Sequence, residues 1–194
     1  MIRSSHTPSP QDLPPPARRL PPQIVGAIGE KCVEVELLRN GWITANVNTS
    51  IKNAADYDLF ALKRGRWVSI RVKACHFTIR AFQFNFRNAE DIIPQDLAAN
   101  DFSIMVNVGC TRDKDEFYIV PTLILRGQIK KQREFYLSRP KRDGGQRKDD
   151  GHWALHLDDM KSDPDRYNCG YAMKWKDYRN AWPVLDADVI SATA

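Results

Sequence analysis

An acid, an arginine and a lysine follow one another in an order that suits phosphate chemistry. Asp58 lies in the segment ADYDLF, and Arg71 and Lys73 lie in the segment WVSIRVKA. The turn residues Arg64-Gly65 between the segments predict two strands joined by a tight turn, which would bring Asp58 near Arg71 and Lys73. Because strand side chains alternate, Arg71 and Lys73 share one face. The pattern therefore aims polar side chains at one spot.

An acid at the end of one strand, followed by acid-x-Lys on the next, makes a magnesium site. Two carboxylates and a backbone carbonyl bind the ion, and the lysine meets the attacking water or the phosphate. Magnesium suits this use because it binds few carboxylates, keeps several waters and accepts a phosphate oxygen as a further ligand.

The residues resemble the PD-(D/E)XK nuclease superfamily over about residues 24 to 125. The segment Gly26–Glu30 resembles the GxxGE helix of the resolvase-like branch. The resemblance implies an α/β fold, with a central mixed β-sheet flanked by helices in a restriction-endonuclease-like core. It maps Glu30, Asp58 and Lys73 onto the family's catalytic positions. It implies Mg²⁺ or Mn²⁺ held by Asp58, Glu30 and the backbone carbonyl of Val72, with Lys73 orienting water.

Arg71 departs from the family pattern, which has Glu, or Gln in some branches, at this position. Arginine cannot bind a cation and is effectively always protonated. A guanidinium repels a unit charge by about 4 kcal/mol at about 4 Å and an effective dielectric near 20, and repels a dication by twice that. We therefore expect weakened metal binding.

Three hypotheses follow from Arg71. In the first, Glu30 or Glu34 supplies the missing ligand, Arg71 contacts a substrate phosphate, and the protein is a magnesium-dependent endonuclease that hydrolyses DNA. In the second, Arg71 pairs with Asp58 or Glu30, and a catalytically silent domain binds nucleic acid or protein. In the third, these residues are surface charges of an unrelated sheet.

Further candidates lie outside this motif. Lys130, Lys131 and Arg142 belong to a basic cluster that either tracks substrate phosphates or is solvated surface. Gln83 and Asn85 alternate with phenylalanines, so they either enter the cleft as accessory residues or are outward positions of a half-buried strand. A homodimer is a further expectation, since nucleases that cut both strands often pair.

Periodicity predicts the elements that position these residues. Apolar residues at helical spacing, ending at Asn40-Gly41, predict a helix over about residues 24 to 39. Later runs predict strands at 42–48, 57–62, 66–74, 82–86, 102–108, 116–121 and 153–157, and helices at 122–131 and 167–182.

Composition sets the domain organisation. A chain of 194 residues with 42% apolar residues fits one domain, here residues 23–185 with a mobile basic loop at 138–151. Residues 1–22 hold seven of the twelve prolines and are predicted to be a disordered tail, and residues 186–194 form a second tail. The net charge of +5 favours polyanionic partners, above all DNA. No apolar run is long enough to span a membrane, so the expected location is the cytoplasm.

Overall fold

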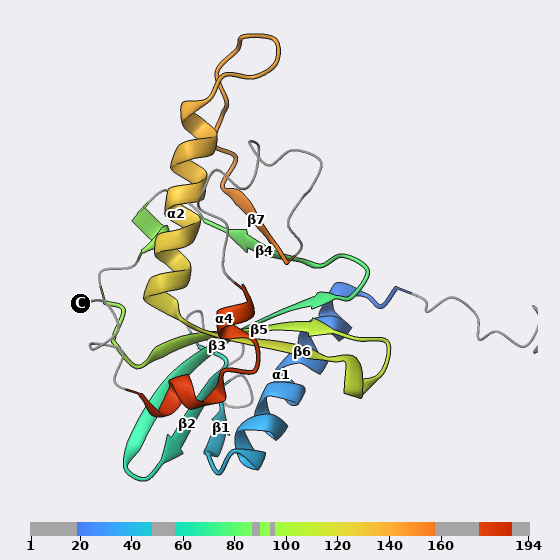
Figure 1. Cartoon of the computed structure of the whole chain (residues 1–194), viewed down its shortest axis with the longest axis vertical. Helices are drawn as coiled ribbons and strands as arrows, with labels where there is room; N and C mark the ends of the chain where they lie inside the picture. Colours follow the sequence, from blue (N-terminus) through green and yellow to red (C-terminus); the bar gives the residue numbers. More distant parts are fainter. Residues whose placement is uncertain (1–18, 48–56, 87–89, 94–95, 158–174, 188–194) are drawn as a thin grey trace, which may run out of the picture.

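Residues 19–47, 57–86, 90–93, 96–157 and 175–187 are described in the computed structural model (Figure 1). The helices and strands are α1 (Pro22–Arg39), β1 (Ile43–Asn46), β2 (Leu59–Lys63), β3 (Arg66–His76), β4 (Ala81–Asn85), β5 (Asp101–Val108), β6 (Glu116–Pro121), α2 (Thr122–Ser138), β7 (His152–His156) and α4 (Trp175–Tyr178). Short 3-10 helices lie at Glu90–Ile92, Arg112–Lys114 and Trp182–Asp186. The predicted disordered tail lies mostly outside the described residues.

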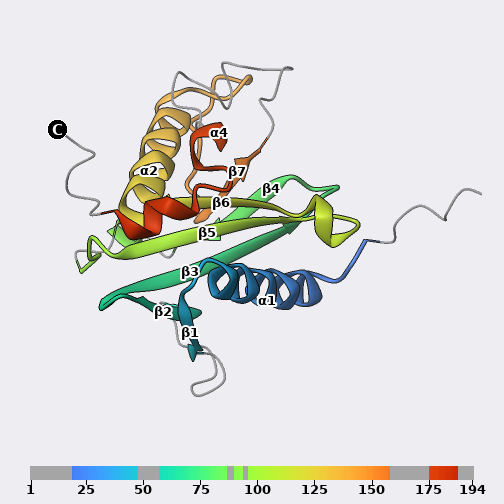
Figure 2. The same ribbon diagram turned by 60° about the horizontal axis from the view of Figure 1, so that its bottom comes forward.

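Five strands form the main sheet, in the order β1-β2-β3-β5-β6. The pair β3–β5 is parallel and the other three pairs are antiparallel, so the sheet is mixed. Helix α1 covers one face and α2 rises from the other (Figures 1 and 2). The predicted α/β architecture, a central mixed sheet flanked by helices, is confirmed.

Two apolar clusters, one on each face, hold the layers together. On the α1 side, Val33 and Leu37 pack with Ile70 and Val106. On the α2 side, the cluster includes Met105, Phe82, Phe84, Leu125 and Ile129. Because both faces of β5 are covered, all of its residues are buried, which explains the apolar run Ile104–Val106 at its centre.

Strands β4 and β7 form a separate antiparallel pair on the α2 side of the main sheet (Figure 2). Phe82 and Phe84 are buried in the α2-side cluster, whereas Gln83 and Asn85 between and beyond them are exposed. The pair therefore places the phenylalanines of β4 close to the polar face of β3.

Two helix predictions were wrong in their bounds. Helix α2 continues to Ser138 because the charged residues after Ile129 are good helix formers and Gln132 and Arg133 are buried. Of the predicted 167–182 helix, residues 167–174 lie outside the described ranges, and the described part is α-helical only at Trp175–Tyr178. Asn180 has a φ of 52°, a left-handed conformation that interrupts a right-handed helix.

Within the described ranges, no helix is both long enough and apolar enough to cross a bilayer.

Candidate functional site

The candidate site lies beside the part of β3 that extends beyond its pairing with β2. Strand β2 begins at Leu59, whereas β3 runs on to His76, so the last part of β3 has an edge that β2 does not cover. The Asp58 N–H donates to the Ile70 carbonyl at 2.9 Å, and the Val72 N–H donates to the Asp58 Oδ2 at 2.7 Å. In an extended strand, N–H and C=O of one residue point to the same edge. The Val72 carbonyl therefore points to the open edge where Asp58 lies.

Lys73 lies on the face of β3 opposite α1, since its neighbour Ala74 points at Gly29 of α1. The Lys73 Nζ lies 5.8 Å from the centre of the Phe84 ring. Burial lowers the pKa of Lys73, and the positive charge of Arg71 lowers it further, while Asp58 acts in the opposite direction. The charges of Asp58 and Arg71 thus both act on Lys73, in keeping with the proximity that the two-strand pattern predicts.

Arg126 is a site residue that the sequence analysis missed. This α2 residue is 8% exposed, and its guanidinium carbon lies 5.1 Å from the centre of the Phe86 ring. Burial, followed by the charge of Arg71, lowers the pKa of Arg126 to about 10. The available signal was a cation on the apolar side of the helix, between Leu125 and Ile129.

Arg133 lies about two turns further along the same side of α2 and is 4% exposed. It forms an ion pair with Asp149, and its guanidinium carbon lies 5.8 Å from the Phe86 ring centre. The hydrogen bond from Arg133 lowers the pKa of Asp149. The buried side of α2 thus carries two arginines against one phenylalanine of the neighbouring chain segment.

Glu30 and Cys32 project from opposite sides of α1. Two α1 residues face the β6 side of the sheet, where the Cys32 Sγ contacts the Asp115 Oδ2 at 3.5 Å and Glu36 pairs with Arg112 at 3.5 Å. Glu30 precedes Cys32 by two residues, roughly 200° of helix rotation, so it points toward the β1–β2 side. Asp58 lies on that side of β3.

Glu34, the other acid considered as a replacement ligand, lies one turn after Glu30. Its Oε2 pairs with the Lys31 Nζ at 2.7 Å. That contact holds the Glu34 carboxylate on the helix surface.

A divalent ion fits this donor set only with help from other ligands. Within the described ranges, no three residues among His, Cys, Asp and Glu gather in a way that would hold a metal. Asp58 lies beside Val72 at the open edge, and Glu30 points from α1 toward the same side of the sheet. Two carboxylates and a carbonyl suit Mg²⁺ when water and a phosphate oxygen complete its shell.

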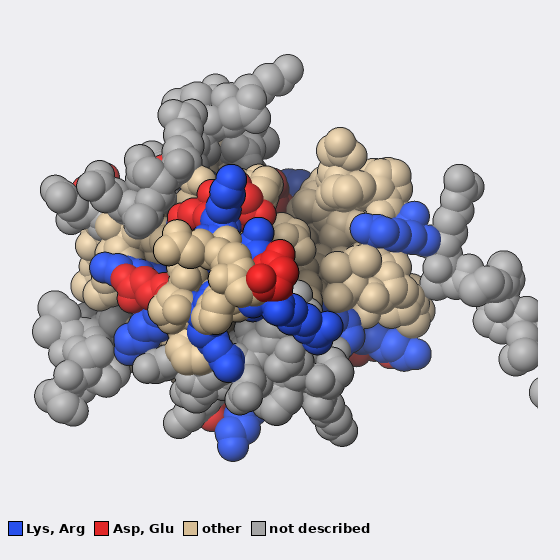
Figure 3. Space-filling view, turned by 90° about the horizontal axis from the view of Figure 1, so that it is seen from above, with Lys and Arg blue, Asp and Glu red and all other residues tan. Residues whose placement is uncertain are grey.

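The remaining predicted residues are not brought to Lys73. Gln83 and Asn85 are exposed because strand alternation puts Phe84 inside and its neighbours outside, and the Asn85 Oδ1 lies 2.6 Å from the His152 Nδ1. Lys130 and Lys131 lie on the exposed side of α2, and Arg142 is exposed in the loop after it. Figure 3, which views the molecule from this end, shows Lys and Arg side chains interspersed with Asp and Glu.

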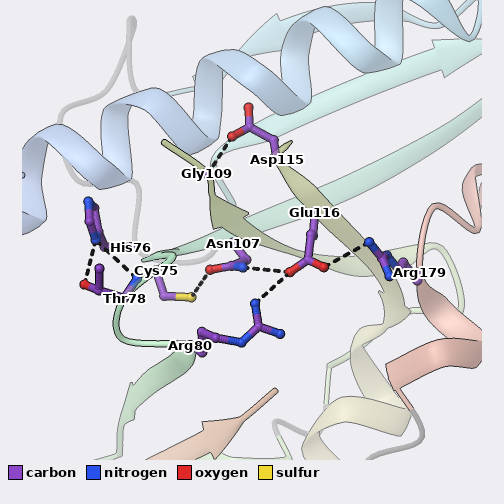
Figure 4. A network of polar contacts seen from close by, with 9 residues as sticks. All are labelled: Cys75, His76, Thr78, Arg80, Asn107, Gly109, Asp115, Glu116 and Arg179. Carbon is purple, nitrogen blue, oxygen red and sulfur yellow. Dashed lines mark hydrogen bonds and ion pairs between the residues drawn. The ribbon is translucent and has the colours of Figure 1, made fainter. Parts of the chain in front are cut away.

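A separate polar network lies at the far ends of β3 and β5 (Figure 4). The Glu116 carboxylate accepts hydrogen bonds from Asn107 at 2.7 Å and Arg80 at 3.1 Å, and pairs with Arg179 at 3.0 Å. Burial raises the pKa of the neighbouring Cys75 thiol to about 12, so the thiol stays neutral at physiological pH. This network is structural rather than nucleophilic.

Comparisons with known proteins concern the fold. No family model matches the chain, and no curated protein sequence matches it. A bacterial homing endonuclease, I-Ssp6803I, is similar with a TM-score of 0.44 and 15% identity, over 87% of this chain and 94% of that one. Hjc, a Holliday junction resolvase from Archaeoglobus fulgidus, is similar with a TM-score of 0.39 and 10% identity, over 68% of this chain and 84% of that one. At these TM-scores and identities, function has to be argued from the side chains of this chain.

Proposed function

We propose that this protein hydrolyses DNA phosphodiester bonds with the help of a divalent metal ion. The observation that supports the proposal is the contact between the Asp58 carboxylate and the Val72 N–H at the open edge of β3. This contact supports the proposal because an acid, a backbone carbonyl and a lysine next to one another suit metal-assisted phosphoryl chemistry.

In this proposal, the acidic residues of the site bind the metal ion and the basic residues bind the phosphate and the attacking water. Asp58, Glu30 and the Val72 carbonyl would hold the ion, which supplies an activated water and neutralises developing negative charge. Arg71 and Arg126 bind the backbone phosphate, because guanidinium groups match the geometry of phosphate oxygens. Lys73 orients the attacking water and stabilises the charge that builds up on the phosphate.

A second candidate function is binding without cleavage, and the same cations favour it. Arg71, Lys73 and Arg126 bring three positive charges together, and their mutual repulsion contributes to the lowered pKa of Lys73. Such a cluster repels a dication as strongly as it attracts a phosphate. In this alternative, the domain holds nucleic acid through its backbone and leaves it intact.

A cleavage assay separates the two functions. Linear, nicked, branched and single-stranded DNA would each be incubated with magnesium or manganese and the wild-type protein, Asp58→Ala or Lys73→Ala. Lys176→Ala, at an exposed position of α4, is the matched control. We expect metal-dependent cleavage that falls at least about 100-fold in both site variants and is unchanged in the control.

DNA binding without cleavage at any metal concentration would favour the binding module. Cleavage that survives both site variants would reject the assignment of the site.

A further inference from the structure

An exposed apolar row crosses β1, β2 and β3 on the face opposite α1. Ile43 pairs with Leu62 across β1 and β2, and Leu62 pairs with Trp67 across β2 and β3. These three side chains are 71%, 45% and 54% exposed. Their neighbours Ala61 and Val68 are buried in the α1-side cluster, which fixes the row on the other face.

Phe60 extends the row toward the site. It is 39% exposed, and its ring centre lies 5.7 Å from that of Tyr57. Phe60 is two residues from Leu62, so both lie on the same face of β2. We name Ile43, Phe60, Leu62 and Trp67 the platform.

The platform and the cationic site lie on the same face of β3, with the buried Ser69 between them. Trp67, Arg71 and Lys73 are separated by even numbers of residues, so all three side chains leave the same face of the strand. Trp67 and Arg71 are four residues apart, about 13 Å along an extended strand. This face of β3 therefore carries an exposed aromatic side chain at one end and the partly buried cations Arg71 and Lys73 at the other.

Charge complementarity identifies the occupant. Arg71 and Lys73 on β3, with Arg126 beside them, attract a polyanion, which an apolar protein partner would not match. Flat aromatic side chains on a sheet stack on nucleic-acid bases, and base faces are accessible only where the bases are unpaired, because a duplex buries them in its own stack.

We infer that the platform stacks the unpaired bases of a single-stranded or branched DNA whose backbone phosphate lies at Arg71 and Lys73. This inference rests on the proposed function and adds the substrate class: DNA that carries a single-stranded segment next to the phosphate bound in the site. Trp67 is the main stacking residue, because it is the largest and half-exposed side chain of the platform.

Fluorescence anisotropy with labelled DNA tests the inference without cleavage. The wild-type protein, Trp67→Ala and Trp67→Phe would be titrated, in a chelator that removes metal, into a single strand, a blunt duplex and a forked duplex. Leu123→Ala is the matched control, since Leu123 is 53% exposed but belongs to α2. We expect Trp67→Ala to weaken binding to the single strand and the fork by about 5- to 150-fold, the range measured for losing one stacked base.

Binding to the blunt duplex should change less than about twofold in Trp67→Ala, and Trp67→Phe should keep most of the affinity because it keeps an aromatic face. Equal weakening for all three DNAs, or no weakening for any, would overturn the inference. A wild-type dimer that dissociates in Trp67→Ala, measured by analytical ultracentrifugation, would overturn it too, since the platform would then be an interface between two copies. The cleavage assay is a separate readout, so a protein that stacks single strands but cuts nothing would retain this inference and lose the proposed hydrolysis.

Discussion

At the scale of single residues, the surroundings of Lys73 disfavour its protonated form and so lower its pKa. Burial is the largest cause of its lowered pKa, and the charge of Arg71 is the second. We expect Arg71→Gln to raise the pKa of Lys73 toward the ordinary value of 10.5, because the repulsive charge disappears. Titration of isotope-labelled lysine side chains by NMR would measure the shift, with Lys73→Ala identifying the resonance.

Arg39→Gln is the control for this titration, because Arg39 is exposed at the end of α1 and pairs with Glu36. It should leave the Lys73 resonance unchanged. The lowered pKa of Lys73 also affects stability. At pH values between this lowered pKa and 10.5, the unfolded state binds more protons than the folded state. Lys73 therefore makes the free energy of unfolding rise with pH in that window. An Arg71→Gln protein whose Lys73 titrates unchanged would show that the two charges do not interact.

Arg71 itself controls the affinity for metal. We expect Arg71→Glu to strengthen magnesium binding by at least about tenfold, because it removes a repelling charge and adds a carboxylate ligand at the edge near Asp58. Isothermal titration calorimetry would measure the dissociation constant. Arg71→Gln removes the charge without adding an anionic ligand, so its magnesium affinity should lie between those of the wild type and Arg71→Glu. Identical affinities in all three proteins would count heavily against a metal site here.

The sequence predicted the part of this site that is local along the chain. Asp58 directly precedes β2, and Arg71 and Lys73 lie on β3, which a tight turn joins to β2, so their proximity follows from alternation and turn chemistry alone. Arg126 and Phe84 reach Lys73 from α2 and β4, whose positions are set by packing between segments distant in sequence. The place of Arg126 on the apolar side of its helix predicts that it is buried, but its proximity to Lys73, like that of Phe84, follows only from the fold.

At the scale of elements, the close packing of α1 against the sheet depends on Gly29. A Cβ added at Gly29 would lie 2.6 Å from the Ala74 Cβ, closer than side chains tolerate. We expect Gly29→Ala to lower the free energy of unfolding by about 1 to 3 kcal/mol, because α1 has to shift away from β3. Chemical denaturation would measure the change.

Gly26→Ala on the same helix is the matched control, since a Cβ there meets nothing within 4 Å. It should raise the free energy of unfolding by about 0.5 to 1 kcal/mol through the better helix propensity of alanine. The double variant Gly29→Ala with Ala74→Gly should recover part of the loss. A Gly29→Ala protein as stable as Gly26→Ala would show that α1 does not rest on β3 at this point.

The elements that the sequence predicted well are those with a strong local pattern. The strand at 116–121 has the predicted bounds, and β5 differs from its prediction by one residue. The end of α2 depends on which of its charged residues are buried, and the break at Asn180 depends on a left-handed backbone, neither of which hydrophobic periodicity encodes.

At the scale of the whole molecule, Glu116 joins segments that are far apart in the sequence. Its carboxylate contacts Arg80 before β4, Asn107 on β5 and Arg179 in the C-terminal segment (Figure 4). Asn107 is 2% exposed, so its amide has little access to water if the acceptor is removed. The network therefore anchors the C-terminal segment and the chain leading to β4 to the edge of the main sheet.

We expect Glu116→Ala to lower the free energy of unfolding by about 1 to 3 kcal/mol, because it leaves a buried amide unsatisfied and two arginines close together. Amides of residues 175–187 should also exchange hydrogen faster, measured by mass spectrometry. Glu134→Ala, which removes an exposed partner 3.9 Å from Lys130, is the control and should change stability by less than about 0.5 kcal/mol. If the two variants prove equally stable, the network does not anchor the C-terminal segment, and Trp175 and Leu185, which are buried in the two apolar clusters, must do so alone.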